Sequence, residues 1–563
     1  MRTLLTLLFC LLPLIASAQW PTTVEEHLEI AVGPETNLSN PITLQLSADR
    51  TLVVLRHGPS TGPVYQIIDR YGRLEFPESQ LLWPAVSQVD DGYLRVISDG
   101  DGGAIVGWEN MAPPQDPGIS VQRINSLGEI QWGDSARFVF SWENSYWGII
   151  GWDICARSGG GFFAVMSQDD SGLPDNLYLQ RLDNNGNRMW SETGIVACPS
   201  NNQTTEPIVI SDESGGCYII WKDFRSTTYG KLFMQRYDSD GNRMWEPDSG
   251  RFICYHTWFH QVIPDGENGF ILQSNPGPTD YNTIYRIGPD GDILWEREEV
   301  SWYYWATIST GEPGFFYLCF PYYPGFPYIL DEVGIYAQKM DIQGNTHWPT
   351  NPGAEMAYVE QWAFSQSSMD LHCRYQDGRL FGIYEFHRLG NESIPRMLYV
   401  QALNESGEKL FGNLGSLVAM LNEQGYERFR WASVAPDDDG GVTCVWDRNF
   451  DLGISHDLYG KHINANGSIG GPIWPPNQLP DPNRDPFLSV SNQTITYSLS
   501  IPGEVSIELY NVLGQQLSSE SFFHQQAGAF SARLPTAGLS SGIYFLRLST
   551  PIGEAVQKVA VVR

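Results

Sequence analysis

The segment SGGCYIIWKDFRSTTYGKLFMQRYDSDGNRMWEPDSG, residues 214–250, decides the fold because copies of it recur along the chain. A second full copy, GGGFFAVMSQDDSGLPDNLYLQRLDNNGNRMWSETG, spans residues 159–194. Both contain a glycine pair, an apolar strand, a variable loop, the pattern [LI]-x-x-Q-[RK]-x-[DN]-x-x-G and a tryptophan four residues after the last glycine. Such internal self-similarity is typical of a repeat architecture.

Eight copies of the pattern can be placed. Around Gly241, residues 207–212, 215–221, 231–238 and 242–255 are expected to form four short strands, with the turn DSDG typical of a hairpin. Eight units of four strands predict an all-β, eight-bladed β-propeller over residues 19–474. The glycines that anchor the units are Gly72, Gly128, Gly186, Gly241, Gly291, Gly344, Gly407 and Gly467.

The two ends of the repeat region predict how the ring closes. The last unit stops near Trp474, soon after its third strand, and residues 20–33 look like a fourth strand without the first three. We therefore expect residues 20–33 to complete the eighth blade. The recurring tryptophans are large enough to bury their rings against the next blade, and they resemble the tryptophan-docking motif of eight-bladed quinoprotein propellers. They are Trp132, Trp190, Trp245, Trp295 and Trp348.

The N-terminus has the features of a signal peptide over residues 1–18. Arg2 precedes an apolar run of twelve residues, 4–15, which is too short to span a membrane as a helix. Ala16-Ser17-Ala18 fits a cleavage site between Ala18 and Gln19. The formal net charge of −31 argues against nucleic acid and anionic membranes as partners. We expect an exported protein without a transmembrane segment, and a monomer.

Seven cysteines remain after the signal peptide, so at least one has no partner within the chain. Cys217, Cys319 and Cys444 lie in apolar, strand-like runs, which predicts buried free thiols. The pairing of the others is left open. The chain has no C-x-x-C pattern, so a structural zinc site is not expected.

The C-terminal region is a separate module. Residues 475–487 are a linker rich in proline and asparagine, and residues 488–563 alternate apolar and polar positions, which predicts a small immunoglobulin-like β-sandwich. The stretches LYNVLGQ (509–515), LSSGIYFLRL (539–548) and QKVAVVR (557–563) resemble the type A C-terminal sorting domain of the type IX secretion system. The motif residues are Leu513, Gly514, Gly542, Ile543, Tyr544, Lys558 and Arg563.

This resemblance implies a route and a partner. The chain would cross the outer membrane of a Gram-negative bacterium through the type IX machinery, after which the cargo is released or attached to the cell surface. The partners expected are therefore this machinery and, for the propeller, a glycan or a surface protein.

Catalytic motifs are absent from the sequence. It contains no G-x-S-x-G, H-E-x-x-H, P-loop or complete EF-hand pattern. His256 and His260 would lie about 13 Å apart on a strand, too far for a shared metal ion. The acidic stretches 98–103, 238–241 and 436–441 fit hairpin turns, with calcium as the alternative. No cofactor is expected.

An irregular set of aromatic residues remains as the candidate for binding. These residues lie where some units lead into their first strand, and they could stack on sugar rings or clasp a peptide. The alternative is that they fill the space between blades. We predict a non-catalytic binding, adhesion or surface structural protein; the alternatives are a propeller enzyme acting on glycans, as a hydrolase or lyase, or a quinoprotein-like oxidoreductase. The candidates are Trp152, Trp258, Trp302, Trp305, Trp362 and Trp431.

Overall fold

The computed structural model describes most of the chain, and the structural statements below refer to these residues. They are 20–31, 38–57, 62–76, 78–83, 94–110, 118–133, 135–140, 149–168, 176–198, 203–225, 230–247, 249–255, 260–274, 283–298, 306–322, 332–349, 353–360, 363–364, 371–387, 396–421, 428–450, 455–471, 488–491, 494–499, 503–511, 515–524, 528–535, 539, 542–550 and 553–561. Residues Gln19–Gly471 form one compact unit, and the strands after Pro472 belong to a second.

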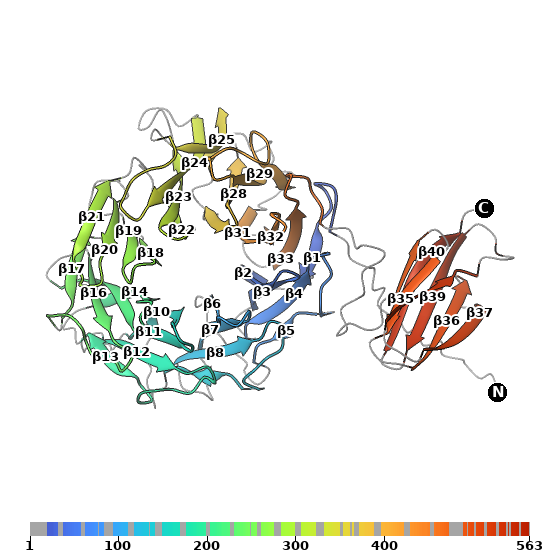
Figure 1. Cartoon of the computed structure of the whole chain (residues 1–563), viewed down its shortest axis with the longest axis horizontal. Coiled ribbons are helices and arrows are strands. Elements are labelled where there is room, and N and C mark those ends of the chain that lie inside the picture. The colour runs from blue at the N-terminus through green and yellow to red at the C-terminus, as the bar shows by residue number, and fades with distance from the viewer. Residues whose placement is uncertain are drawn as a thin grey trace. The chain divides into compact units, whose positions relative to one another are not determined.

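The first unit consists of eight antiparallel sheets that follow one another along the chain and stand side by side around a ring (Figure 1). The first sheet contains β2 (Leu38–Ser47), β3 (Arg50–His57), β4 (Val64–Asp69) and β5 (Gln80–Leu81). The second contains β6 (Arg95–Ser98), β7 (Ala104–Asn110), β8 (Gly118–Ile124) and β9 (Arg137–Phe138). The third contains β10 (Ile149–Ala156), β11 (Phe162–Gln168), β12 (Asn176–Leu182) and β13 (Ile195–Cys198).

The next three sheets repeat this order. The fourth contains β14 (Thr204–Ser211), β15 (Cys217–Asp223), β16 (Lys231–Tyr237) and β17 (Arg251–Tyr255). The fifth contains β18 (His260–Pro264), β19 (Phe270–Ser274), β20 (Thr283–Ile287) and β21 (Ile293–Glu298). The sixth contains β22 (Thr307–Thr310), β23 (Phe315–Tyr322), β24 (Glu332–Asp341) and β25 (Ala354–Glu360).

The last two sheets depart slightly from the pattern. The seventh has five strands because its first strand is divided: β26 (Ala363–Phe364), β27 (His372–Gln376), β28 (Arg379–His387), β29 (Arg396–Leu403) and β30 (Ser416–Leu421). The eighth contains β31 (Arg428–Pro436), β32 (Val442–Phe450), β33 (Ser455–Ile463) and, from the other end of the chain, β1 (Leu28–Ala31). The prediction of an eight-bladed propeller is confirmed, as is its completion by the N-terminal strand.

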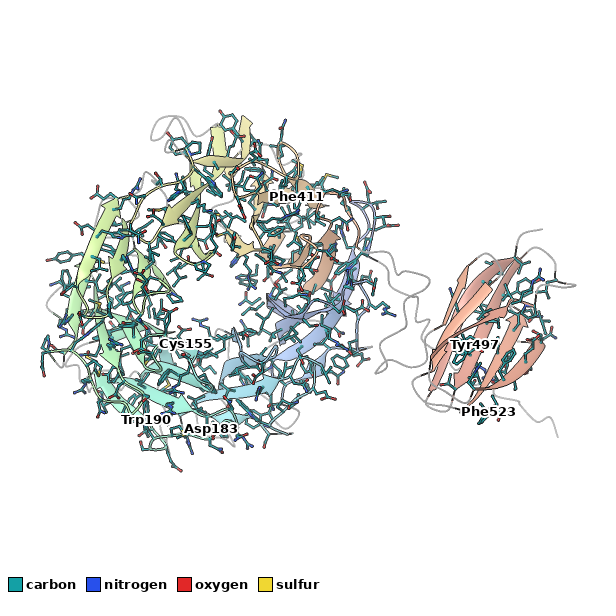
Figure 2. The ribbon with its side chains drawn as sticks, in the orientation of Figure 1. Cys155, Asp183, Trp190, Phe411, Tyr497 and Phe523 are labelled. Carbon is teal, nitrogen blue, oxygen red and sulfur yellow. The ribbon has the colours of Figure 1, made fainter. Side chains whose placement is uncertain are left out.

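The second unit contains two antiparallel sheets that share one apolar core. One sheet contains β34 (Leu488–Ser491), β35 (Thr494–Leu499) and β38 (Gly528–Arg533). The other contains β36 (Gly503–Asn511), β37 (Gln516–His524), β39 (Gly542–Thr550) and β40 (Gly553–Val561). Tyr497 of the first sheet and Leu546 of the second belong to the same buried cluster (Figure 2). This arrangement agrees with the predicted small β-sandwich.

Each tryptophan of the repeat packs on the turn glycine of the next sheet. Gly241 has a backbone φ of +86°, and a methyl group placed on it would lie 2.9 Å from Cζ2 of Trp190, whose side chain is labelled in Figure 2. The indole nitrogen often adds a hydrogen bond to the same turn: Nε1 of Trp295 donates to the carbonyl of Ile342 at 2.8 Å. The other ring–glycine pairs are Trp20–Gly72, Trp132–Gly186, Trp245–Gly291, Trp295–Gly344, Trp348–Gly407 and Phe411–Gly467.

In six of the eight sheets, a buried glutamine fixes the backbone of the aromatic residue that follows the turn. In the fourth sheet, Oε1 of Gln235 accepts a hydrogen bond from the amide of Trp245 at 3.2 Å, and its Nε2 donates to the carbonyl of the same residue at 3.1 Å. The amide of the docking residue makes the same bond in five other sheets, to Gln66, Gln122, Gln180, Gln338 and Gln401. The recurring glutamine of the sequence pattern therefore fixes the position from which the aromatic side chain packs on the next sheet.

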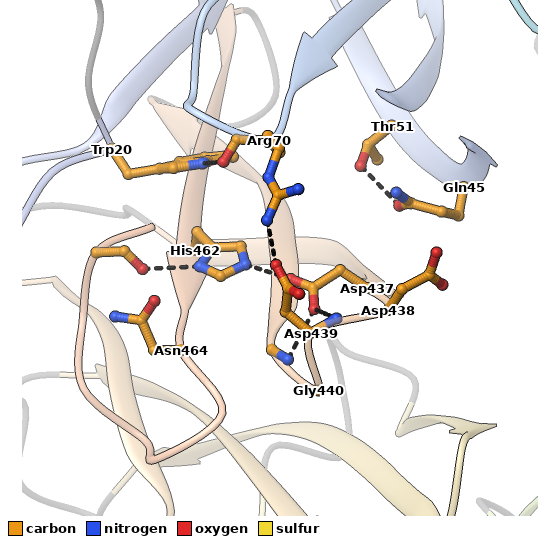
Figure 3. Close-up of polar contacts among 12 residues, drawn as sticks. Trp20, Gln45, Thr51, Arg70, Asp437, Asp438, Asp439, Gly440, His462 and Asn464 are labelled. Atoms are coloured by element: carbon orange, nitrogen blue, oxygen red, sulfur yellow. Dashed lines mark hydrogen bonds and ion pairs between the residues drawn. The ribbon is translucent and has the colours of Figure 1, made fainter. Parts of the chain in front are cut away.

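The eighth sheet uses different residues for the same task at the seam where the ring closes. Lys461 replaces the glutamine, and its Nζ donates to the carbonyls of Thr23 and Val24 at 3.0 and 2.9 Å. Trp20 docks on the first sheet, with Nε1 donating to the carbonyl of Arg70 at 2.9 Å (Figure 3). Arg70 also pairs with Asp439 of the eighth sheet. Burial lowers the pKa of the Lys461 ammonium to about 8.

Substitution of Gly241 by alanine tests the docking contact. The alanine must adopt a positive φ, which costs about 1 kcal/mol, and its methyl group overlaps Trp190, which adds about 1–3 kcal/mol. We expect urea unfolding to show a loss near the sum of the two. Gly266→Ala is the matched control, because Gly266 has a φ of +77° and no atom within 4 Å of the added methyl group. Equal losses in the two variants would contradict the docking account.

Acid is expected to weaken the seam through His27. Its ring lies 5.2 Å from that of Trp446, and burial, helped by Lys461 and Arg448, lowers the pKa of His27 to about 4. The unfolded chain, with a histidine pKa of about 6.5, binds this proton more tightly. The free energy of unfolding should therefore fall as the pH drops from about 6.5 toward 4. Urea titrations across this range should show a shallower fall in His27→Phe, and an unchanged slope would exclude His27 as the cause.

Candidate functional site

Three of the innermost strands contain a bulge with a residue in the left-handed backbone region. The register shifts in β2, β14 and β31 coincide with Asn40, Glu206 and Trp431, whose φ values are +55°, +52° and +41°. Asparagine tolerates this region, whereas a bulky side chain there is strained by about 1–3 kcal/mol. Trp431 is half-buried. The bulge therefore holds a partly exposed indole at the inner edge of the eighth sheet.

Trp152 lies in β10, whose register shift falls between Ile149 and Gly151, and its ring is buried. It is only 3% exposed and packs in the contact between the second and third sheets. A methyl group on Gly107 would lie 3.0 Å from its ring, and the Arg95 guanidinium lies 5.6 Å from the ring centroid. The structure thus assigns Trp152 to packing, which was the alternative for these aromatics.

The other predicted aromatic positions stay predictions, because Trp258, Trp302, Trp305 and Trp362 lie outside the described residues. The same holds for Ala18 and Gln19 of the cleavage site and for Leu513, Gly514 and Arg563 of the sorting motif. Sequence reasoning missed Asn40 and Glu206 as counterparts of Trp431. The signal available was their shared place in the strand, directly before Pro41, Pro207 and Ala432.

Buried carboxylates of the propeller are paired within the contacts between sheets. Oδ2 of Asp212 lies 2.9 Å from Nη2 of Arg236, and the same guanidinium donates through Nη1 to the carbonyl of Pro289 in the next sheet at 3.0 Å. Asp99–Arg123 and Asp265–Arg286 repeat this bridge. These carboxylates hold one sheet to the next.

His462 takes the place of the arginine in the eighth sheet. Its Nε2 lies 2.6 Å from Oδ2 of Asp437, and its Nδ1 lies 2.7 Å from the carbonyl of Gly470 (Figure 3). Burial acts to raise the pKa of Asp437. The hydrogen bond and charge of His462, with the amides of Gly441 and Asp439, outweigh burial and hold that pKa below its ordinary value. The pair thus stabilises an ionised carboxylate beside the seam.

Asp153 is a carboxylate on the innermost strand of the third sheet, β10. It lies 3.0 Å from Nε of Arg95 in the second sheet, and its other oxygen accepts from the amide of Val209 in the fourth at 3.1 Å. Burial, only partly offset by Arg95, raises the pKa of Asp153. One side chain therefore ties three consecutive sheets together.

The acidic turns are held by their own backbone amides. Oδ1 of Asp99 accepts from the amides of Asp101 and Gly103 at 2.8 and 2.7 Å, and Asp238 and Asp437 make the same bonds in their turns. These bonds are those of a hairpin turn. Within the described residues, no group of three or more His, Cys, Asp or Glu side chains is arranged to hold a metal ion. The side chains of the His256 and His260 pair lie outside that part of the chain.

The seven described cysteines are free thiols. Cys217, Cys319 and Cys444 are fully buried, which confirms the prediction for them. Burial also raises the pKa of the Cys198 and Cys254 thiols to about 11. At neutral pH these groups are protonated and act as small apolar side chains.

Strand β39 carries most of the described sorting motif. Tyr544 points into the core of the second unit, and the neighbouring Ile543 is 44% exposed on the opposite face. The register pairs Phe545 with Lys558 of β40. Arg547 lies 2.7 Å from Oε2 of Glu508 on β36. The motif therefore lies on two paired strands, with alternate residues in the core and on the surface.

The described residues contain no helix that is long and apolar enough to cross a membrane. A ring of eight repeated sheets followed by a small two-sheet unit defines the class as a β-propeller protein with a C-terminal accessory domain. Residues 489–562 match the family described as "Secretion system C-terminal sorting domain". The chain is thus a β-propeller protein exported by the type IX secretion system, and it is secreted or attached to the outer surface of a Gram-negative bacterium.

Solved structures with similar folds are distant. A puromycin hydrolase is 12% identical with a TM-score of 0.35, and the match covers 76% of this chain and 61% of that chain, less than two thirds of its length. The α-L-arabinofuranosidase Arb93A from Fusarium graminearum is 9% identical with a TM-score of 0.30, covering 68% of this chain and 95% of that one. No curated protein sequence matches the chain. Similarities this weak carry no information about activity.

Truncation before Gly542 tests the export route. It removes β39 and β40, two of the four strands of the larger sheet, and should leave the propeller intact because that unit has its own core. We expect the truncated chain to accumulate in the periplasm, as measured by fractionation and surface proteolysis. The matched control is the full chain with Ser519→Ala, an exposed residue of β37. Undiminished surface delivery of the truncated chain would contradict the assignment.

Proposed function

We propose that this exported propeller acts by binding a ligand rather than by catalysis, and that Trp431 contacts the ligand. The observation that carries the proposal is the left-handed backbone of Trp431, with a φ of +41° at the inner edge of the ring. A strained bulky residue is a candidate for function because folding alone would favour a glycine or asparagine there. A partly exposed indole suits the apolar face of a sugar ring.

The arrangement of the buried carboxylates supports a binding role. Catalysis by general acid and base requires carboxyl groups that can exchange protons with a substrate. Asp99, Asp212 and Asp265 are instead each bonded to an arginine that bridges to the next sheet. Asp153 faces both Arg95 and a backbone amide. These ion pairs stabilise the propeller, which would then serve as a rigid support for the residues that bind the ligand.

Replacement of Trp431 by glycine separates binding from packing. Glycine adopts the positive φ without strain, so the free energy of unfolding should stay constant or rise by about 1 kcal/mol. Binding to a glycan array should be lost, because the indole is gone. Trp446→Ala is the comparison for a packing role: Trp446 is 1% exposed, and its loss should cost about 3–5 kcal/mol.

The opposite pattern would overturn the proposal. If Trp431→Gly destabilises the protein as strongly as Trp446→Ala and leaves the array profile unchanged, the Trp431 ring fills space and binds nothing.

A further inference from the structure

The exposed apolar side chains of the propeller are concentrated on one part of its outer wall. Of the eight large apolar residues exposed in the described propeller, seven belong to the third, fourth and fifth sheets. Clustered exposed apolar groups on a soluble protein mark interaction sites. The most exposed aromatic pair is Phe252 and Tyr255, 46% and 55% exposed, on β17, the outermost strand of the fourth sheet (Figure 1).

A row of four aromatic rings supports this pair from the core outward. Trp221 is fully buried and lies 6.2 Å from Phe233 on the next strand. Phe233 lies 5.9 Å from Phe252, which lies 5.5 Å from Tyr255 with the two ring planes at 70°. The exposed rings of Phe252 and Tyr255 therefore pack on buried rings, and they lie at a steep angle to each other on the surface. This angled pair is called the corner below.

A lysine lies at this corner. The Nζ atom of Lys231 is 5.1 Å from the centroid of the Tyr255 ring and 6.0 Å from that of Phe252. Both distances are within the range of a cation–π contact. The register pairs Lys231 directly with Tyr255, so the strands themselves place the ammonium beside the exposed rings.

Lys231 differs from the other four lysines of the propeller. Three of them pair with glutamates, Lys222 with Glu206, Lys339 with Glu312 and Lys409 with Glu355, and Lys461 donates to backbone carbonyls. Among the described residues, Lys231 has no carboxylate within ion-pair distance. In a chain with a formal net charge of −31, a lysine without a carboxylate partner in the described part of the chain is a candidate for binding an anion from outside.

We propose that Lys231, Phe252 and Tyr255 form a binding site for an acidic sugar unit, a carboxylated pyranose within an oligosaccharide. The apolar C–H face of the sugar would stack on one exposed ring, and its carboxylate would accept a charge-assisted hydrogen bond from Lys231. An acidic peptide would satisfy the lysine but offers no flat apolar face for the corner. The site lies on an outer strand and does not depend on Trp431 of the inner strand β31.

Calorimetry of the full chain with oligogalacturonate, and with the neutral galacto-oligosaccharide of equal length, tests this site. Lys231→Met should weaken binding of the charged oligosaccharide about tenfold and leave any binding of the neutral one unchanged. Tyr255→Ala should weaken binding of both. Lys409→Met removes one positive charge from a paired lysine elsewhere and should change neither. Added salt should weaken only the interaction with the charged oligosaccharide.

Three outcomes would overturn the inference. They are equal binding of the two oligosaccharides, an unchanged affinity in Lys231→Met, and binding of an acidic peptide but not of oligogalacturonate. Trp431→Gly is expected to retain oligogalacturonate binding at this site. The Lys231 and Tyr255 variants therefore test the acidic-sugar site, and Trp431→Gly tests the role proposed for Trp431, independently of each other.

Discussion

The packing of an aromatic ring on the turn glycine of the next sheet, which occurs at seven of the eight contacts between sheets, is the contact on which the closed propeller depends. A side chain at Gly241 would be strained by the positive φ and would overlap the Trp190 indole. The turn residue must therefore be glycine, and the side chain that packs on it must be large and flat. The same pair recurs around the propeller and joins its two ends through Trp20 and Gly72. One local requirement therefore explains both the repeated sequence pattern and the closed architecture.

Closure of the propeller also determines how its buried carboxylates are paired. Asp212 and Arg236 bridge neighbouring sheets, and Asp153 ties three of them. Polar groups buried in this way must be paired, because an unpaired buried charge is strongly destabilising. Among the described residues, the candidate positions for ligands are the bulge at the inner edge that contains Trp431 and exposed side chains on outer strands, such as Tyr255.

Features that recur in several repeat units could be predicted from the sequence, whereas features found in one unit only could not. The turn glycines could be predicted because they recur in eight units, and the docking tryptophans because they recur in five. The closing strand could be predicted because the last unit lacks a fourth strand and residues 20–33 resemble one. Trp152 and Trp431 could not be distinguished from the sequence, because the contact between sheets that buries Trp152 and the left-handed backbone of the partly exposed Trp431 are visible only in the structure. Lys231, Phe252 and Tyr255 occur in one unit only, and strand pairing rather than sequence spacing brings them together.

The claim that the chain forms one ring, closed by its N-terminal segment, is tested most directly by amide hydrogen exchange of the full chain and of Trp20→Ala. We expect faster exchange in the variant at two places far apart in sequence. They are strand β33, which pairs with β1, and the turn at residues 69–73, where Trp20 docks. Exchange in the sixth sheet should not change. Unchanged protection at both places would contradict closure by this contact.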